Sequence, residues 1–173
     1  MNIFKNTDSL SLTATLDKST IDLVLTDPPY IISHETGFKS VKNGVQRFAV
    51  ETEFGDWDKP ENFSLGALED SIKEYYRVLR AGGTAIIFCD IWKITKIKEI
   101  LERNKFKQIR LIDWIKTNPV PLNSSRNYLT NSREVALSAV KVSKPTFNSK
   151  YDNGLYRYPI CHDKGRFHST QKP

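Results

Sequence analysis

The chain has 173 residues, enough for one α/β core and too few for two domains of ordinary size. Its 26 Lys and Arg residues against 20 Asp and Glu give a net charge of +6, which favours a polyanionic partner. Two cysteines, no zinc-ligand pattern and no apolar run long enough to cross a bilayer exclude a disulfide-rich scaffold, a zinc module and a membrane-spanning protein. We therefore expect a single cytoplasmic domain over residues 1–173, with no metal site.

The first predicted element is a short buried strand over residues 21–27, IDLVLTD, because its leucines and β-branched residues show no helical period. The polar stretch at 33–58 contains Gly37, Gly44 and Gly55 and also lacks a strong period. We expect it to form a long loop, which in a compact domain is usually functional or mobile.

A helix is predicted within KPENFSLGALEDSIKEYYRVLRAGG, residues 59–83, with Pro60 in its first turn. Its apolar side chains recur at steps of three and four and share one face: Leu68, Ile72, Tyr75 and Leu79. Gly82 and Gly83 are expected to end the helix, since glycine adopts the left-handed C-cap conformation at low cost.

Further along the chain the pattern predicts a strand over 84–90 and a basic amphipathic helix over 91–106, with Ile94, Ile97 and Leu101 facing inward. Strands follow over 107–118 and 133–141, separated by a turn-rich loop, and residues 142–173 are expected to form an irregular tail. Strands that alternate with helices indicate an α/β fold. We expect a mostly parallel sheet with helices on both faces and an antiparallel edge formed by the later strands.

The motif DPPY, residues 27–30, stands where the first strand ends, and ligands of open α/β sheets bind at this end of the strands. Pro28 and Pro29 restrict the backbone and remove two donors, so that the carbonyls of Asp27 and Pro28 can face a cleft. The Asp27 carboxylate accepts hydrogen bonds, and the Tyr30 ring can stack on a planar heterocycle. This combination suits an exocyclic amino group on a base, although a proline turn closed by a packed tyrosine explains the same residues taken alone.

Four segments in this order resemble the β-type S-adenosylmethionine-dependent DNA amino-methyltransferases of bacterial restriction–modification and phage systems. They are DPPY, YYRVLRAGGTAIIFCD, the Trp-Ile-Lys-Thr-Asn-Pro segment with the strand after it, and HSTQKP at 168–173, where the family usually has proline in place of Ser169. The resemblance implies a partial Rossmann-like methyltransferase sheet and methyl transfer to the N6 amino group of adenine in double-stranded DNA. A flipped base would bond to Asp27 and Pro28 and stack on Tyr30.

The same resemblance implies which residues bind the cofactor, and the charge of the polar loops suggests which residues contact DNA. Asp27 and the residues of the terminal motif, Thr170, Lys172 and Pro173, are expected to approach S-adenosyl-L-methionine. The candidate DNA contacts lie in the two polar loops and are Lys39, Lys42, Arg47, Arg126 and Tyr128. A solvated surface is the more common explanation of basic residues such as Lys39, Lys42 and Arg47, and ordinary loop polarity explains Arg126 and Tyr128 nearly as well.

The sequence departs from the family in one respect, because no glycine-rich cofactor loop follows HSTQKP. Only 26 residues precede DPPY, and the last six belong to the strand that leads to it, so too few are left for three strands of ordinary length and the cofactor-binding strands cannot come first. We expect a fragment, one half of a split enzyme or a decayed remnant. A missing carboxy-terminal half, a separate partner chain and a homodimer all stay open. The alternative functions are cytosine-N4 methylation of DNA, an RNA or protein amino-methyltransferase, and a non-catalytic DNA-binding remnant.

Overall fold

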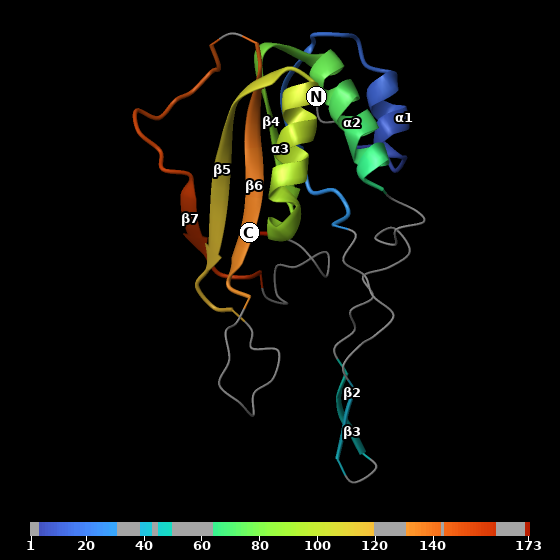
Figure 1. Ribbon diagram of the computed structural model, residues 1–173, viewed down its shortest axis with the longest axis vertical. Helices are drawn as coiled ribbons and strands as arrows, with labels where there is room; N and C mark the ends of the chain where they lie inside the picture. Colours follow the sequence, from blue (N-terminus) through green and yellow to red (C-terminus); the bar gives the residue numbers. More distant parts are fainter. Residues whose placement is uncertain are drawn as a thin grey trace.

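The computed structural model describes residues 4–30, 39–42, 45–49, 64–119, 131–142, 144–161 and 172–173 (Figure 1). Its helices are α1 (Ser9–Ala14), α2 (Leu65–Val78) and α3 (Ile94–Arg103), with a 3₁₀ turn η2 (Ile91–Lys93). Its strands are β1 (Ile21–Thr26), β2 (Lys39–Lys42), β3 (Val45–Ala49), β4 (Leu79–Cys89), β5 (Phe106–Lys116), β6 (Arg133–Lys141) and β7 (Leu155–Tyr158). Among the described residues, no helix is long and apolar enough to cross a membrane.

Five strands form one sheet in the order β1-β4-β6-β5-β7, which confirms the α/β class. Strand β1 is parallel to β4, and β5 is parallel to β7, whereas β6 is antiparallel to both of its neighbours. The expected antiparallel edge is therefore wrong, because the antiparallel strand lies inside the sheet. The burial of β6 fits a central position, because both of its faces are covered. Val135 and Leu137 are buried on one face and Ala136 on the other, as is typical of a central strand.

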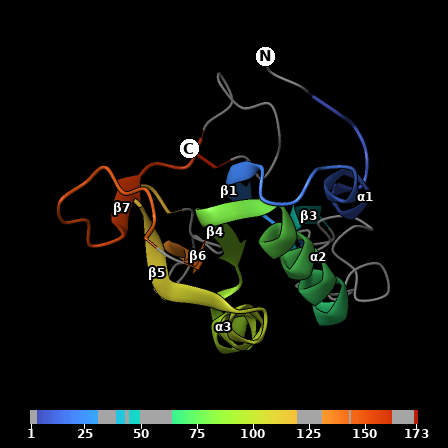
Figure 2. The same cartoon turned by 90° about the horizontal axis from the view of Figure 1, so that it is seen from above.

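Helices α2 and α3 pack on the same face of the sheet, which curls around them (Figure 2). Their buried side chains join those of β4, β5 and β6 in a single core that includes Ile72, Ile87, Leu101 and Phe106. Helix α1, which the sequence analysis did not predict, packs against α2. Asp8 is its N-cap residue, and the Asp8 side chain accepts a hydrogen bond from the Ser11 N–H. A second helical layer on the opposite face is not present among the described residues, contrary to expectation.

The end of α2 also differs from the prediction. The helix ends at Val78, and Leu79 already has an extended conformation and begins β4, so the two glycines lie inside a strand and do not cap the helix. Leu79 is fully buried and pairs with Ile21 of β1. Because the sheet ladder and the core both hold Leu79, tertiary pairing overrides the local preference of glycine for a helix end.

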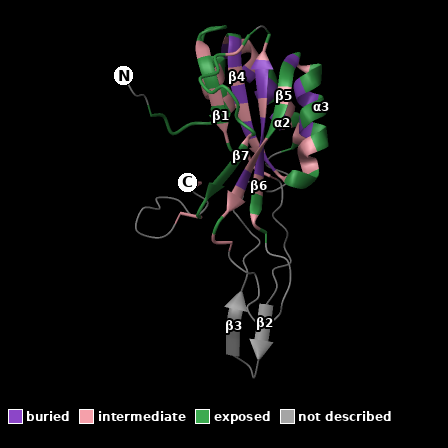
Figure 3. Cartoon of the chain, turned by 90° about the vertical axis from the view of Figure 1, so that its left-hand side faces the viewer, coloured by how far each residue is buried: buried purple, intermediate pink, exposed green. Residues whose placement is uncertain are grey.

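Strand β1 is less buried than its apolar sequence predicted. Leu23 is 51% exposed and Leu25 is 63% exposed, and Figure 3 shows exposed and intermediate residues along β1 beside the buried residues of β4. The reason is position, since among the described strands β1 is the last at its side of the sheet and pairs with β4 alone. Apolar composition alone does not distinguish such an edge strand from a central one.

Both segments expected to be irregular contain strands. Within 33–58, strands β2 and β3 form a separate antiparallel pair, which Figure 1 draws away from the main sheet. Within 142–173, β7 adds to the edge of β5, and the Trp114 indole N–H donates to the Tyr158 carbonyl at 3.0 Å. The predicted strands over 84–90, 107–118 and 133–141 are confirmed, with the first beginning five residues earlier than expected.

Candidate active site at the carboxyl end of β1

The DPPY corner directly follows β1 at the carboxyl end of a strand that is parallel to its neighbour. The Asp27 side chain is 40% exposed, whereas Pro28, Pro29 and Tyr30 are each partly buried. A carboxylate therefore faces solvent at a backbone corner that two prolines restrict. Asp27 is not enclosed in packed protein, so it can reach an incoming group.

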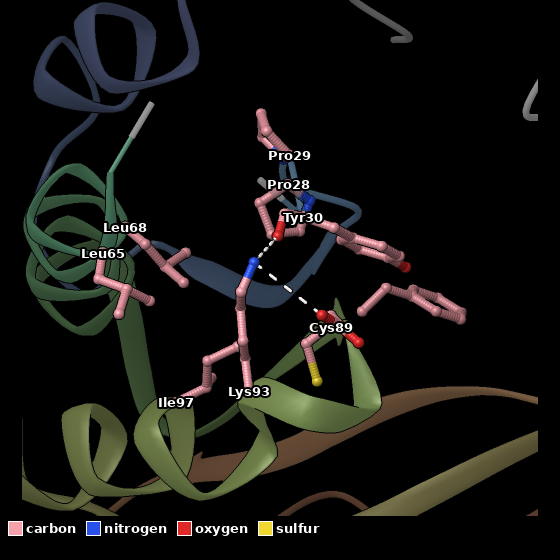
Figure 4. A pocket seen from close by; sticks show the side chains of 10 residues that line it. Pro28, Pro29, Tyr30, Leu65, Leu68, Cys89, Lys93 and Ile97 are labelled. Atoms are coloured by element: carbon pink, nitrogen blue, oxygen red, sulfur yellow. Dashed lines mark hydrogen bonds and ion pairs between the residues drawn. The ribbon is translucent and has the colours of Figure 1, made fainter. Parts of the chain in front are cut away.

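The backbone of the corner is held from the helical side of the sheet. In Figure 4 the Lys93 ammonium reaches up from η2 and donates a hydrogen bond to the Tyr30 carbonyl. Pro28 and Pro29 border a small hollow on this side, together with Leu68 and Ile97. The hollow has room for about one water molecule, so it is not where a nucleobase could bind.

The Lys172 side chain reaches Asp27 from the other end of the chain. Its Nζ lies 2.6 Å from Asp27 Oδ2 and 2.9 Å from Glu134 Oε2. The same nitrogen lies 4.9 Å from the centre of the Phe88 ring and 5.6 Å from that of Tyr30, within the range of cation–π attraction. Two carboxylates and two aromatic rings thus surround a single ammonium group.

Glu134 is held on the other side by a second lysine. Its Oε1 lies 2.8 Å from Lys116 Nζ on β5, and the Lys116 ammonium lies 5.4 Å from the centre of the Trp114 ring. Burial by itself raises the pKa of Glu134, but hydrogen bonds and charges from the two lysines outweigh burial, so that the pKa is lowered. Glu134 is therefore ionised at neutral pH although it lies largely inside the protein.

Two other titratable groups near the corner stay protonated at neutral pH. Burial raises the pKa of the Tyr30 hydroxyl far above its usual range, and the nearby Asp27 carboxylate raises it further. Burial, followed by the charge of Asp90, raises the pKa of the Cys89 thiol to about 12. Neither group is available as an anionic nucleophile at neutral pH. Tyr30 therefore presents an uncharged aromatic ring at the corner.

The structure brings together some of the predicted site residues and leaves others outside its description. Asp27, Tyr30 and Lys172 meet, and Pro173 follows Lys172 as an exposed residue. Lys39, Lys42 and Arg47 lie in the β2–β3 pair, and their side chains are outside the described part, as are Arg126, Tyr128 and Thr170 altogether. The proposed roles of these six residues stay predictions.

Sequence reasoning missed three residues of the cluster around Lys172, namely Phe88, Lys116 and Glu134. The signal that could have found Glu134 is its place at the start of an otherwise apolar central strand, where an acid needs a partner. Among the described residues, no group of three His, Cys, Asp or Glu side chains could hold a metal ion.

The arrangement suits chemistry on an amine rather than nucleophilic attack by the protein. A carboxylate with one oxygen bound to Lys172 keeps acceptor capacity on the other oxygen. The Tyr30 and Phe88 rings provide flat apolar surfaces next to it, and carboxylate and rings together attract positive charge.

Residues 21–173 match the family described as DNA methylase. The Type II methyltransferase M2.LlaDCHI of Lactococcus lactis subsp. cremoris is 32% identical over 91% of this chain and 55% of its own length. The Type II methyltransferase M.HinfI of Haemophilus influenzae is 30% identical over the whole of this chain and 54% of its own length. The chain thus spans about half the length of the curated relatives it matches.

Solved structures agree with this relationship. The crystal structure of an M1.HpyAVI–SAM complex superposes with a TM-score of 0.56 and 28% sequence identity. The superposition covers 89% of this chain and 60% of that protein. The Rossmann-like methyltransferase architecture implied by the four sequence segments is confirmed.

Proposed function

This chain belongs to the DNA methylase family, and on that basis we propose that it carries the catalytic corner of an S-adenosylmethionine-dependent DNA methyltransferase. The proposed reaction is methylation of the N6 amino group of adenine in double-stranded DNA, in a restriction–modification or phage setting. The observation that carries the proposal is the exposed Asp27 carboxylate beside the neutral Tyr30 ring, at the end of a strand where such folds bind their ligands.

Asp27 and the backbone of the corner would orient the amino group. A flipped adenine presents two N–H donors, which the second oxygen of Asp27 and the Pro28 carbonyl could accept. Lys93 holds the corner by its bond to the Tyr30 carbonyl, so these acceptors need little rearrangement when the base arrives. Tyr30, whose hydroxyl stays protonated, would stack on the base without adding charge.

The described residues fit one end of the cofactor. S-adenosylmethionine supplies a methyl group on a positively charged sulfur, and the Asp27 carboxylate with the Phe88 and Tyr30 rings suits a cation at this place. Thr170, Lys172 and Pro173 are proposed to lie towards the same ligand. DNA contacts from Lys39, Lys42, Arg47, Arg126 and Tyr128 belong to the same proposal, supported by the chain's net charge of +6.

The test is methylation of duplex DNA by the full-length protein with isotope-labelled S-adenosylmethionine, followed by mass spectrometry of the nucleosides. We expect label in N6-methyladenine. Label in N4-methylcytosine would replace the adenine assignment by the cytosine alternative, and label only in RNA would overturn the DNA assignment. Absence of label under all conditions would favour a non-catalytic DNA-binding protein.

Residue roles are tested by Asp27→Ala, which is expected to abolish methylation while leaving DNA affinity nearly unchanged. Asp22→Ala is a matched control, because Asp22 lies on β1, the strand that leads to the corner, is 75% exposed and pairs with Arg80. If Asp27→Ala retained the methylation rate of the control, the role assigned to the carboxylate would be wrong.

A further inference from the structure

Four charged side chains on separate segments form a continuous row that ends at Asp27. Lys116 contacts Glu134 at 2.8 Å, Glu134 contacts Lys172 at 2.9 Å, and Lys172 contacts Asp27 at 2.6 Å. The charges alternate in sign along the row and sum to zero. Each interior member therefore has an opposite charge on both sides, which is the arrangement that buried or half-buried charges require.

The row runs from shielded to exposed positions. Lys116 is 13% exposed and Glu134 22%, whereas Asp27, at the end where a substrate can arrive, is 40% exposed. Glu134 stands on β6 in the middle of the sheet, where its backbone pairs with Trp114 of β5. It is therefore attached to a central strand of the sheet, with its carboxylate in contact with the Lys172 ammonium beside the corner.

Lys172 has no such attachment of its own. It lies in no helix or strand of the described part. A lysine side chain has many rotamers, and a single exposed ion pair seldom orders it. The second carboxylate, that of Glu134, and the rings of Phe88 and Tyr30 restrict the ammonium to one place.

We propose that Glu134 is a positioning residue for methyl transfer, which acts by holding Lys172 against one oxygen of Asp27. This inference rests on the proposed function. With Oδ2 of Asp27 bound to Lys172, the plane of the carboxylate is set and the second oxygen is left for the amino group of the base. Glu134 touches neither reacting group, so its effect passes through Lys172.

The negative charge of Glu134 also contributes to methyl transfer, in addition to holding Lys172 in place. Methyl transfer breaks the bond between the sulfonium sulfur and the methyl carbon and forms a bond from that carbon to the neutral amine nitrogen. The sulfur leaves as an uncharged thioether, and the positive charge appears on the amine nitrogen near Asp27 until that nitrogen releases one proton to solvent. The ammonium of Lys172 would oppose that charge if it stood alone, and the carboxylate of Glu134 offsets it. The row thus orients Asp27 without adding net positive charge to the site.

The kinetic test compares Glu134→Gln with wild type in the full-length protein. We expect kcat to fall by about 10- to 100-fold, the range for a misplaced catalytic group, with KM for DNA little changed. Glu102→Gln is the matched control, because Glu102 forms an exposed ion pair with Lys98 at 2.6 Å on α3 and should leave kcat unaltered. Glu134→Asp keeps the charge at a shorter reach and should lower kcat less than Glu134→Gln.

A double variant separates positioning through Lys172 from a general structural effect. If Glu134 acts through Lys172, then Glu134→Gln combined with Lys172→Met should be no slower than Lys172→Met alone. The proposal would be overturned if the two substitutions each lowered kcat and their factors multiplied in the double variant. A Glu134→Gln enzyme with full kcat would overturn it as well.

A labelling experiment tests the same contact without methylation activity. Acetylation of lysines followed by mass spectrometry should show slow modification of Lys172 in wild type and several-fold faster modification in Glu134→Gln, with Lys98 unchanged. Equal Lys172 labelling in the two proteins would refute the contact. Faster labelling in a protein that methylates no nucleic acid would uphold the contact and the hold on Asp27 while the proposed function failed.

Discussion

Replacing Gly82 by alanine should destabilise the protein because two independent constraints exclude a side chain there. Gly82 has a φ of +78°, a left-handed conformation that costs a non-glycine residue about 1–3 kcal/mol. A Cβ at this position would also lie 2.5 Å from the Lys144 carbonyl oxygen, which must move away. Overpacking of this kind adds about 1–3 kcal/mol. We expect Gly82→Ala to lower the free energy of unfolding by about 2–6 kcal/mol in total.

Urea unfolding followed by circular dichroism measures this loss directly. The control is Gly66→Ala in the first turn of α2, where the new Cβ would meet only the Ser64 hydroxyl at an ordinary 3.5 Å. That change should be neutral or stabilising by up to about 1 kcal/mol, since alanine is the better helix former. A Gly82→Ala protein within about 0.5 kcal/mol of wild type, the usual range for an unconstrained surface site, would refute the reasoning and place the helix end back at the glycines.

Three further predictions follow from burial and charge. Cys89, whose pKa is about 12, should resist thiol reagents at pH 8 in the native protein, while the partly exposed Cys161 reacts first; equal rates by mass spectrometry would contradict this. Phe106→Ala should cost about 3–5 kcal/mol in urea unfolding, because Phe106 is 1% exposed and meets the Tyr76 ring edge-on at 5.1 Å. The lowered pKa of Glu134 means that its ion pairs stabilise the fold fully above about pH 4.5, the ordinary value, and that this stability is lost as the pH falls through the folded pKa. Glu134→Gln should therefore flatten the acid side of the stability–pH profile, and an unchanged profile would show that the pairs add no pH-dependent stability.

The sheet was predictable where local pattern and tertiary position agree. The strand over 133–141 was predicted with its correct bounds. Its apolar sequence favours a buried strand, and its central place in the sheet buries it on both faces, so local preference and tertiary position agree. The pattern failed at Leu79, which was placed on the helix face but belongs to the next strand. A buried leucine satisfies both assignments, and pairing with Ile21, 58 residues away, decides between them.

The candidate site also contains residues that the sequence could identify and residues that it could not. Asp27 to Tyr30 could be singled out because a strand, two prolines and an aromatic residue are neighbours in the chain, so their chemistry is visible in one short segment. The partners of Asp27 could not be named, because Lys172 is 145 residues away and Glu134 lies on a different strand.

The sequence by itself determined the α/β class, the corner that ends β1 and the family, because each depends on contiguous residues or on their order along the chain. Only the tertiary structure decided that the antiparallel strand is central, that the described helices α2 and α3 share one face, and that two lysines and two carboxylates alternate beside the corner. The physical reason is that strand pairing and ion pairing join groups by distance in space. Local periodicity carries no record of that distance.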